Sequence, residues 1–589
     1  MQIEQTINHG KAYLRLAYGI GDIVDGVRQS KKVVLKNLGP LSRFDDGKPN
    51  YLERLRASYR AGDPLIDILN DYPYVAPKKR GRPRNNTFCD SYIIPKNIGY
   101  FFLDSVFDKL GIYDVLNEHK SKNKLGYDII GLTKLLVFGR VLDPQSKKFT
   151  FANHRDRYLF NVTKSDDINE VYNTLTQLDK LNEKIQKRMN YKVNKMIKRD
   201  TETVFYDVTN TFFETEYPDD FRKWGHSKEN RRQPLVQLGL FMDNNGLPIS
   251  FKTFPGNTQD KSTLRPALQE HINKYKLGKV IVVADRGLNT GVNNLALIDD
   301  KNGYIVSQSV KRCPKDMYKW ITDDVDHSKQ KYNFIVKSRK VEREYLDKDG
   351  KKRTTLEKQV CYWSRKFYNR EMHENADFIE HLNNCIENPD KIKDKEPKLN
   401  KFLKEITVDP ITGEKIKVKK IKEVDEAKAK RYIDSMGYYV IVTSETDRSS
   451  DWIMNKYHGL SQIEDNFRIM KSELDLRPVF VRTKEHIDAH MLLCFIGLLM
   501  IRLLQFCIKD KKGDTDGWTE GITARRLKEV LNNLFVDRQS NGQYKVTKPA
   551  EEIYQLLKSC DIEFDFELPY LPELQQLKYN IDRNLLCAN

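Results

Sequence analysis

Four side chains that can do chemistry are regularly spaced along one short stretch of the C-terminal half. Tyr457, Glu464 and Lys471 are seven residues apart in succession, and Arg468 follows Glu464 by four. An α-helix turns about 100° per residue, so seven-residue steps return to nearly the same face. The spacing therefore predicts one helix over 457–471 with a phenol, a carboxylate, a guanidinium and an ammonium on one stripe. A solvated helix with an i,i+4 Glu–Arg pair is the alternative.

Two further carboxylates fall in apolar strand-like segments. Asp207 lies within Phe-Tyr-Asp-Val-Thr, and Asp285 ends the run Val-Ile-Val-Val-Ala-Asp. Burying a carboxylate costs several kcal/mol unless a partner compensates it, and a divalent cation is such a partner. Carboxylate oxygens suit Mg²⁺ or Mn²⁺. Two such ions about 3.5–4 Å apart can activate a water or a 3′-hydroxyl and stabilise the leaving oxygen. A helix cap or a turn is the alternative for each aspartate alone.

The elements around these residues predict a mixed sheet with helices packed on it. Strands are expected at 204–213, 235–242, 248–254, 279–285, 304–309 and 438–443, and helices at about 260–275, 291–299 and 483–508. The order βββ-α-β-α-β indicates an antiparallel meander followed by crossover units. This arrangement would bring the two aspartates and the glutamate-bearing helix into one α/β unit.

Composition shifts divide the chain into seven segments. They are an N-terminal α+β unit (1–75), a basic linker (76–94), a helical and DNA-binding region (95–200), the first part of the core (201–310), an inserted β-rich domain (311–435), the second part of the core with the glutamate helix (436–510) and an α/β tail that could mediate oligomerisation (511–589). The linker contains Arg80-Gly-Arg82-Pro83, which resembles an AT-hook, an extended segment whose arginines enter the narrow minor groove of A·T-rich DNA. A plain solvated linker is the alternative.

The charge balance points to a polyanionic partner. The 589 residues include 101 Lys and Arg against 83 Asp and Glu, a net charge of +18, and nucleic acid is the first candidate. The eight cysteines show no CxxC spacing, which argues against a zinc ribbon or a secreted disulfide framework. No signal peptide is expected, and the apolar run 491–501 is too short to span a membrane. His486 and His490 are four apart but lack an HExxH pattern, so packing is favoured over zinc.

The motifs together resemble a known family. Asp207 in Tyr-Asp-Val-Thr-Asn, Asp285 in Val-Val-Ala-Asp-Arg-Gly, and Tyr457, Glu464 and Lys471 followed by Leu-Asp-Leu-Arg-Pro resemble the DDE transposases of bacterial insertion sequences. More narrowly, they resemble the group that has a Y-R-E-K signature and a β-rich insertion before the glutamate. The stretches 225–231 and 255–260 are also similar to that group. One departure is Leu460, which occupies the position of the signature arginine.

The resemblance implies a fold, a reaction and partners. The expected fold is α/β, with an RNase H-like mixed β-sheet core and the inserted β-rich domain. Two Mg²⁺ (or Mn²⁺) ions would serve hydrolytic cleavage at the element ends and joining of the 3′ ends to target DNA. The partner would be double-stranded DNA, which a homodimer would bind in the synaptic complex. The protein would act at the nucleoid in the bacterial cytoplasm and would not associate with a membrane. An RNase H-like nuclease without strand transfer and a domesticated DNA-binding derivative are the alternatives.

The resemblance and the chemistry together assign roles to residues. Asp207, Asp285 and Glu464 would be the catalytic metal ligands. The expected DNA contacts are Tyr457, Arg468, Lys471, Arg286, Lys228, Arg231, Arg80 and Arg82. Trp320 and Trp363 are candidates for stacking on a flipped base, although a core position is favoured for each.

Overall fold

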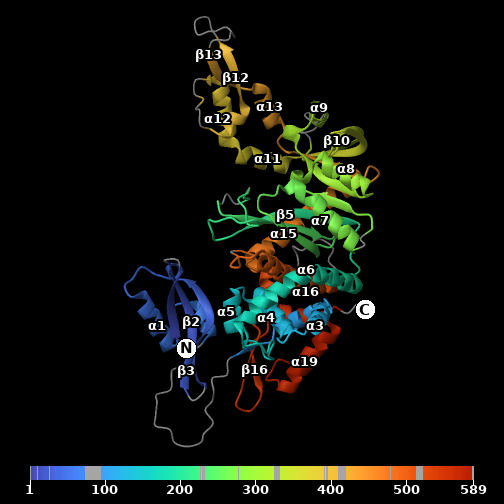
Figure 1. Cartoon of the computed structure of the whole chain (residues 1–589). Helices are drawn as coiled ribbons and strands as arrows, with labels where there is room; N and C mark the ends of the chain where they lie inside the picture. Colours follow the sequence, from blue (N-terminus) through green and yellow to red (C-terminus); the bar gives the residue numbers. More distant parts are fainter. Residues whose placement is uncertain are drawn as a thin grey trace, which may run out of the picture.

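The computed structural model describes residues 2–586 except 9–10, 25–26, 73–94, 226, 229–231, 276–277, 324–331, 390–391, 393–395, 409–418, 478 and 513–521. An eight-stranded sheet and a layer of helices form the body of the molecule, with a small three-stranded unit beside the helices (Figure 1). The expected α/β class is confirmed as a large mixed sheet with many helices.

The large sheet mixes antiparallel and parallel strands. Its order is β10 (Phe334–Leu346), β11 (Lys352–Ser364), β14 (Tyr438–Thr443), β9 (Gly303–Gln308), β8 (Ile281–Ala284), β5 (Thr203–Phe212), β6 (Leu235–Met242) and β7 (Pro248–Pro255). β5, β8 and β9 are mutually parallel, whereas every other neighbouring pair is antiparallel. The meander β5-β6-β7 therefore continues into two parallel crossover strands.

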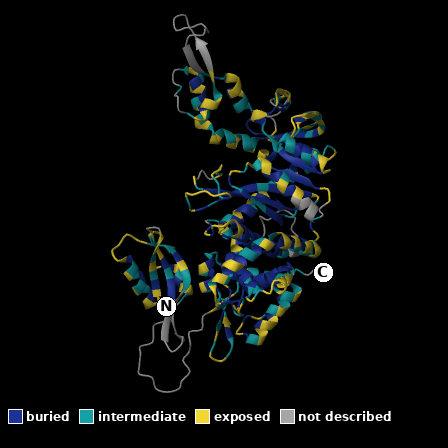
Figure 2. Cartoon of the chain, in the orientation of Figure 1, coloured by how far each residue is buried: buried dark blue, intermediate teal, exposed yellow. Residues whose placement is uncertain are grey.

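Both faces of the sheet are covered, which explains why its central strands read as apolar runs. β6 is buried at all eight positions. Gly239 in β6 has no room for a side chain, because a Cβ there would lie 2.4 Å from the Tyr206 hydroxyl oxygen. Helices α7 (Asp260–Tyr275), α8 (Gly291–Asp299) and α9 (Lys315–Thr322) share a core with one face of the sheet, where α7 contacts β5, β6 and β7, and α8 contacts β9 and β10. The dark core in Figure 2 follows the sheet and the helical layer.

The other face packs on a helical layer built around α16 (Lys484–Lys512). Residues 484–508 of α16 are long and apolar enough to cross a membrane, but 94% of the most apolar window is buried inside the protein. α16 packs against α6 (Ile168–Ile197) and α4 (Ile129–Leu142). The remaining helices of the region from residue 95 to 200 are α2 (Tyr100–Lys109), α3 (Ile112–Lys122) and α5 (Lys147–His154). α16 is thus a core helix of this fold.

The two ends of the chain form smaller units. β1 (Gln2–Asn8), β2 (Lys11–Val24) and β3 (Val27–Pro40) make an antiparallel sheet that shares a core with α1 (Tyr51–Ala61). The tail consists of α17 (Ala524–Asn532), β15 (Phe535–Arg538), β16 (Tyr544–Val546), α18 (Glu551–Ser559) and α19 (Leu571–Asn584). β15 pairs with β4 (Lys96–Asn97), so the tail is joined to the start of the helical layer.

The segment expected to be an inserted β-rich domain divides into two parts. Its first hairpin, β10–β11, joins the large sheet through β14. The second part contains α11 (Arg365–Glu374), α12 (Ala376–Glu387), β12 (Leu403–Val408), β13 (Lys419–Val424) and α13 (Glu426–Asp434), around a small core of its own. α11 and α12 are separate helices, because α11 ends at Glu374 and α12 begins at Ala376.

Candidate active site

Asp207 lies in β5, and Asp285 directly follows the adjacent parallel strand β8. Tyr206 of β5 pairs with Ala284 of β8, and each aspartate is the next residue along its strand direction. The two carboxylates are therefore brought to the same place, where β8 ends and β5 continues. Asp207 is half-buried and Asp285 is exposed.

The surroundings of Asp207 disfavour its charge. Burial is the main reason that its pKa is raised to about 6, and the charges of Asp285 and Asp260 raise it further. Opposing them are the Lys228 ammonium and the Val208 N–H, which donates to Asp207 Oδ1 at 2.7 Å. Like charges and partial desolvation both favour the protonated acid. A cation held beside Asp207 would relieve this repulsion.

Lys228 places a positive charge beside Asp207 and Asp260. Its Nζ donates to the backbone oxygen of Val208 and lies 3.8 Å from Asp260 Oδ2. Asp260 begins α7. The sequence alone does not reveal this role of Asp260, since nothing local shows that the start of α7 lies near the middle of β5. Lys228 was expected on a phosphate, and in this structure it faces Asp207 and Asp260.

The helix expected over 457–471 is wrong as a single element. The structure has α14 (Ser450–His458), α15 (Leu460–Arg468) and a π-helical turn at Ile469–Glu473. The break at Gly459 allows a close approach to β5, because a Cβ there would lie 2.5 Å from Phe205 Cζ. A π-turn closes i→i+5 bonds and changes the angular step. The seven-residue step from Glu464 to Lys471 therefore crosses a change in angular step, so regular α-helical spacing does not apply to Lys471.

The side chains of this region also differ from the expected pairing. Arg468 donates to Asp465 at 2.6 and 2.9 Å, so its ion pair is with Asp465 rather than with Glu464. Glu464 is exposed, and Lys471 is half-buried in the π-helical turn. Leu460 packs partly against the large core. This contact helps to seat α15 on the core.

Tyr457 is the residue that connects the glutamate helix with the aspartates. Burial is the main reason that its pKa is raised to about 12, and the charges of Asp285 and Glu464 raise this pKa further. A hydrogen bond to the Ser307 side chain and the charge of Arg286 act in the opposite direction. The phenol thus lies within electrostatic reach of both carboxylates. Arg286, expected on DNA, is exposed at the start of the 3₁₀ turn after Asp285.

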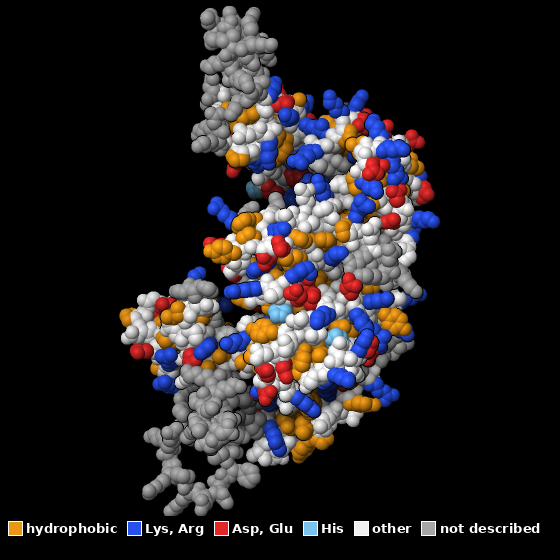
Figure 3. All heavy atoms as spheres, in the orientation of Figure 1, with side chains coloured by type: hydrophobic (Ala, Val, Ile, Leu, Met, Phe, Trp, Pro, Cys, Tyr) orange, Lys and Arg blue, Asp and Glu red, His pale blue; other side chains and the backbone are white. Residues whose placement is uncertain are grey.

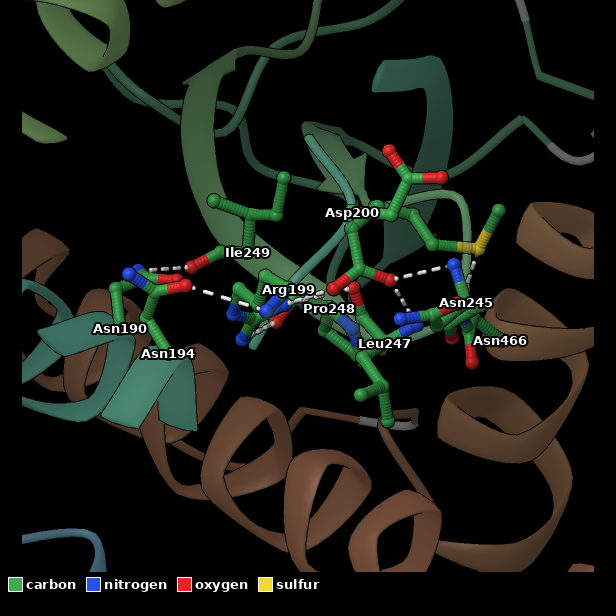
Figure 4. A network of polar contacts seen from close by, with 12 residues as sticks. Asn190, Asn194, Arg199, Asp200, Asn245, Leu247, Pro248, Ile249 and Asn466 are labelled. Atoms are coloured by element: carbon green, nitrogen blue, oxygen red, sulfur yellow. Dashed lines mark hydrogen bonds and ion pairs between the residues drawn. The ribbon is translucent and has the colours of Figure 1, made fainter. Parts of the chain in front are cut away.

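A buried polar cluster holds α15 on the sheet. Asn466 donates to the oxygen of Gly246 at 3.2 Å and accepts from Arg502 Nε at 2.6 Å. Arg502 also donates to Asp465 at 2.6 Å. Figure 4 shows Asn466 beside Asn245 of the β6–β7 turn. In the same turn, the buried Asp243 accepts a hydrogen bond from Arg199 at 2.6 Å. Sequence reasoning missed Asn466 and Arg502, although a polar residue on an apolar helix face was a usable signal.

The donor set fits a hard divalent cation at the aspartate pair. Asp207 and Asp285 are neighbouring carboxylates, one of them half-buried and disfavoured as a bare charge. Within the described ranges, however, no group of three His, Cys, Asp or Glu side chains is close enough to hold a metal ion. Asp207 and Asp285 are therefore neighbours, but Glu464 does not lie close enough to form a three-carboxylate metal site with them. Glu464 as the third ligand therefore stays a prediction.

Other predicted residues lie elsewhere or outside the described ranges. Trp363 is buried in the core, and the Trp320 ring lies beneath Arg339 at 4.4 Å and Lys337 at 5.3 Å. His490 contacts Lys147 Nζ at 2.6 Å and the Leu476 oxygen at 3.1 Å, which agrees with packing rather than zinc. Arg80, Arg82 and Arg231 lie outside the described residues.

Comparisons with known proteins identify the central region. A family model described as a transposase DDE domain matches residues 200–500. No curated protein matches the chain. Among solved structures, one match is a piggyBac transposase synaptic complex with hairpin DNA, determined by cryo-EM, at 9% identity and a TM-score of 0.34, covering 78% of this chain and 76% of that chain.

Proposed function

Because the chain belongs to the transposase family that carries a DDE domain, we propose that it is the transposase of a bacterial insertion sequence. It binds the element ends, cleaves DNA by metal-dependent phosphodiester hydrolysis and joins the 3′ ends to target DNA. We assign it to the group with the Y-R-E-K signature. Its place of action would be the nucleoid in the bacterial cytoplasm.

The strand order supports an RNase H-like core within the sheet. Counted inward from the edge, β7-β6-β5 is an antiparallel meander and β8 and β9 follow parallel to β5. This is the connection order expected for that core. The hairpin β10–β11 and β14 extend it on the other side.

The observation that carries the proposal is the pair Asp207, which lies in β5, and Asp285, which directly follows the neighbouring parallel strand β8. The pair would hold Mg²⁺ or Mn²⁺, with Glu464 as the expected third ligand. Two such ions supply a nucleophile and stabilise the leaving oxygen. Lys228 balances the charge of the aspartates, and Tyr457 can donate a hydrogen bond to a phosphate oxygen placed between Asp285 and Glu464.

The charge of the chain supports DNA as the partner. The net charge of +18 favours a polyanion. Lys and Arg side chains are spread over the face drawn in Figure 3 and are frequent around β10, α8 and α9. We propose that Arg286, Arg468 and Lys471 contact the phosphate backbone, with Arg80, Arg82 and Arg231 adding contacts. Synapsis of two ends would require a homodimer.

Incubation of the purified full-length protein with labelled element ends and Mg²⁺ tests the proposal. Asp207→Asn and Glu464→Gln should each lower cleavage at least 100-fold while end binding is retained, because phosphate contacts dominate affinity. Glu563→Gln, which changes an exposed carboxylate in the tail, is the matched control and should cleave normally. Cleavage by Asp207→Asn at the wild-type rate would refute the assignment. Cleaved ends without joined products would indicate the nuclease instead.

A further inference from the structure

A closed ring of polar side chains lies directly behind the turn that carries Asp285. On one side, Asn289 and Arg343 both donate to Gln308, each at 3.3 Å. Arg343 also donates to Glu357 at 3.2 Å, and Tyr345 donates to the same carboxylate. Asn294 closes the ring, since it donates to the Tyr345 hydroxyl at 3.4 Å and to Asn289 at 3.1 Å. The ring joins the end of the 3₁₀ turn, helix α8, strand β9 and the hairpin β10–β11.

Asn289 is the member of the ring nearest to the aspartates. Its Nδ2 donates to the oxygen of Ser307 at 2.9 Å as well as to Gln308, and its Oδ1 accepts from Asn294. The backbone closes the turn, since Leu288 N–H donates to the Asp285 oxygen at 3.0 Å and Asn289 N–H donates to the Arg286 oxygen at 3.2 Å. The amide therefore fastens the far end of the turn that starts at Asp285 to strand β9.

Glu357 anchors the opposite side of the ring. Its side chain is 0% exposed and accepts from Tyr304 at 3.1 Å and Gln359 at 2.9 Å in addition to Tyr345 and Arg343. A buried carboxylate with four donors is held rigidly, because moving it would weaken several hydrogen bonds that offset the cost of burying its charge. The hairpin is thereby locked to the strand that borders the Asp285 turn.

We infer that Asn289 is a positioning residue for Asp285 and that the ring transmits the placement of the hairpin β10–β11 to this carboxylate. Ser307 strengthens the connection, since its carbonyl is held by Asn289 while its side chain bonds to Tyr457. The expected effect on metal binding at Asp285 rests on the proposed function. The inference that Asn289 fixes the position of the turn after Asp285 is independent of that function.

Two tyrosines provide a matched comparison. Tyr345 and Tyr304 both donate to Glu357, but Tyr345 alone of the two also accepts from Asn294 within the ring. Hydrogen–deuterium exchange of the full-length protein, without DNA or metal, should show several-fold faster exchange at 285–290 in Tyr345→Phe than in Tyr304→Phe. Asn289→Ala, at a half-buried position, should show the same effect directly and keeps the test available if Tyr345→Phe does not fold. Equal exchange in all three variants and the wild type would overturn the inference.

Manganese binding tests the functional consequence. By calorimetry, Asn289→Ala and Tyr345→Phe should weaken Mn²⁺ binding about threefold or more, with DNA affinity and Tm close to those of Tyr304→Phe. A purely structural role would lower Tm without a selective loss of Mn²⁺ affinity. If the wild type neither binds Mn²⁺ nor cleaves DNA, the proposed function fails, and the exchange comparison still decides whether the ring holds the turn.

Discussion

At the scale of single residues, Asp207 destabilises the fold that it serves. Its pKa, raised to about 6, lies above the ordinary value of 3.8. The unfolded chain therefore loses this proton at lower pH than the folded chain does, and the folded state becomes relatively less stable as the pH rises from about 4 to 6. Above pH 6 the full penalty applies.

Asp207→Asn removes this penalty. In metal-free buffer at pH 7.5 it should raise the free energy of unfolding by about 2 kcal/mol, allowing for the partial exposure of the side chain. The gain should shrink below pH 6 and nearly disappear at pH 4. Urea unfolding of the variant and the wild type across this range is the measurement. A variant that is no more stable than the wild type at pH 7.5 would show that burial and the neighbouring carboxylates do not destabilise the ionised form of Asp207.

The residues found from sequence are those whose type conflicts with their local pattern. Asp207 and Asp285 are visible because an aspartate is unexpected in an apolar strand. Asp260 and Asn289 are not, since an aspartate at a helix start and an asparagine in a turn agree with their local surroundings. Their importance arises from contacts with strands that are distant in the sequence.

At the scale of elements, the junction at Gly459 sets how closely the glutamate helix approaches the sheet. Gly459→Ala would place a Cβ 2.5 Å from Phe205 Cζ and 2.7 Å from Cε1. Such overpacking should lower the free energy of unfolding by about 1–3 kcal/mol and should also reduce cleavage by displacing α15. Thermal unfolding and end cleavage measure the two effects.

Gly126→Ala is the matched control. An added Cβ at Gly126 meets nothing within 4 Å, so the change should alter stability by no more than about 0.5 kcal/mol. If the two alanine variants are equally stable, the close contact with Phe205 does not constrain the junction.

Periodicity predicted the strands and long helices well, but not the interruptions. β5, β6, β7, α8 and β14 lie within a residue or two of the expected ranges. The break at Gly459 and the π-helical turn were missed because both depend on what the helix packs against. The pattern of apolar residues along 457–471 is compatible with one straight helix.

At the scale of the whole molecule, the basic linker connects the N-terminal unit to the body. If Arg80 and Arg82 enter a narrow minor groove, replacing both by alanine should weaken binding to A·T-rich ends more than binding to G·C-rich DNA. A preference change of about fivefold or more, measured by titration at fixed salt, is expected. An equal loss on both DNAs would indicate a general electrostatic tether.

The sheet order could not be predicted in full from the sequence. The meander and the two crossover strands follow from the order of the elements. The position of β14 between β9 and β11 does not, because strand pairing over more than 70 residues leaves no trace in local periodicity. The expectation of a separate β-rich domain arose from the same limitation.

That position of β14 has a consequence for biosynthesis. The ribosome completes the hairpin β10–β11 and strand β9 before residues 438–443 exist, yet β14 is the strand that joins them. At about 5–20 residues per second, the nascent chain spends several seconds with two unpaired strand edges. During that interval, chains growing on the same messenger RNA can exchange strands, so the pace of translation through this segment bears on the yield of active protein.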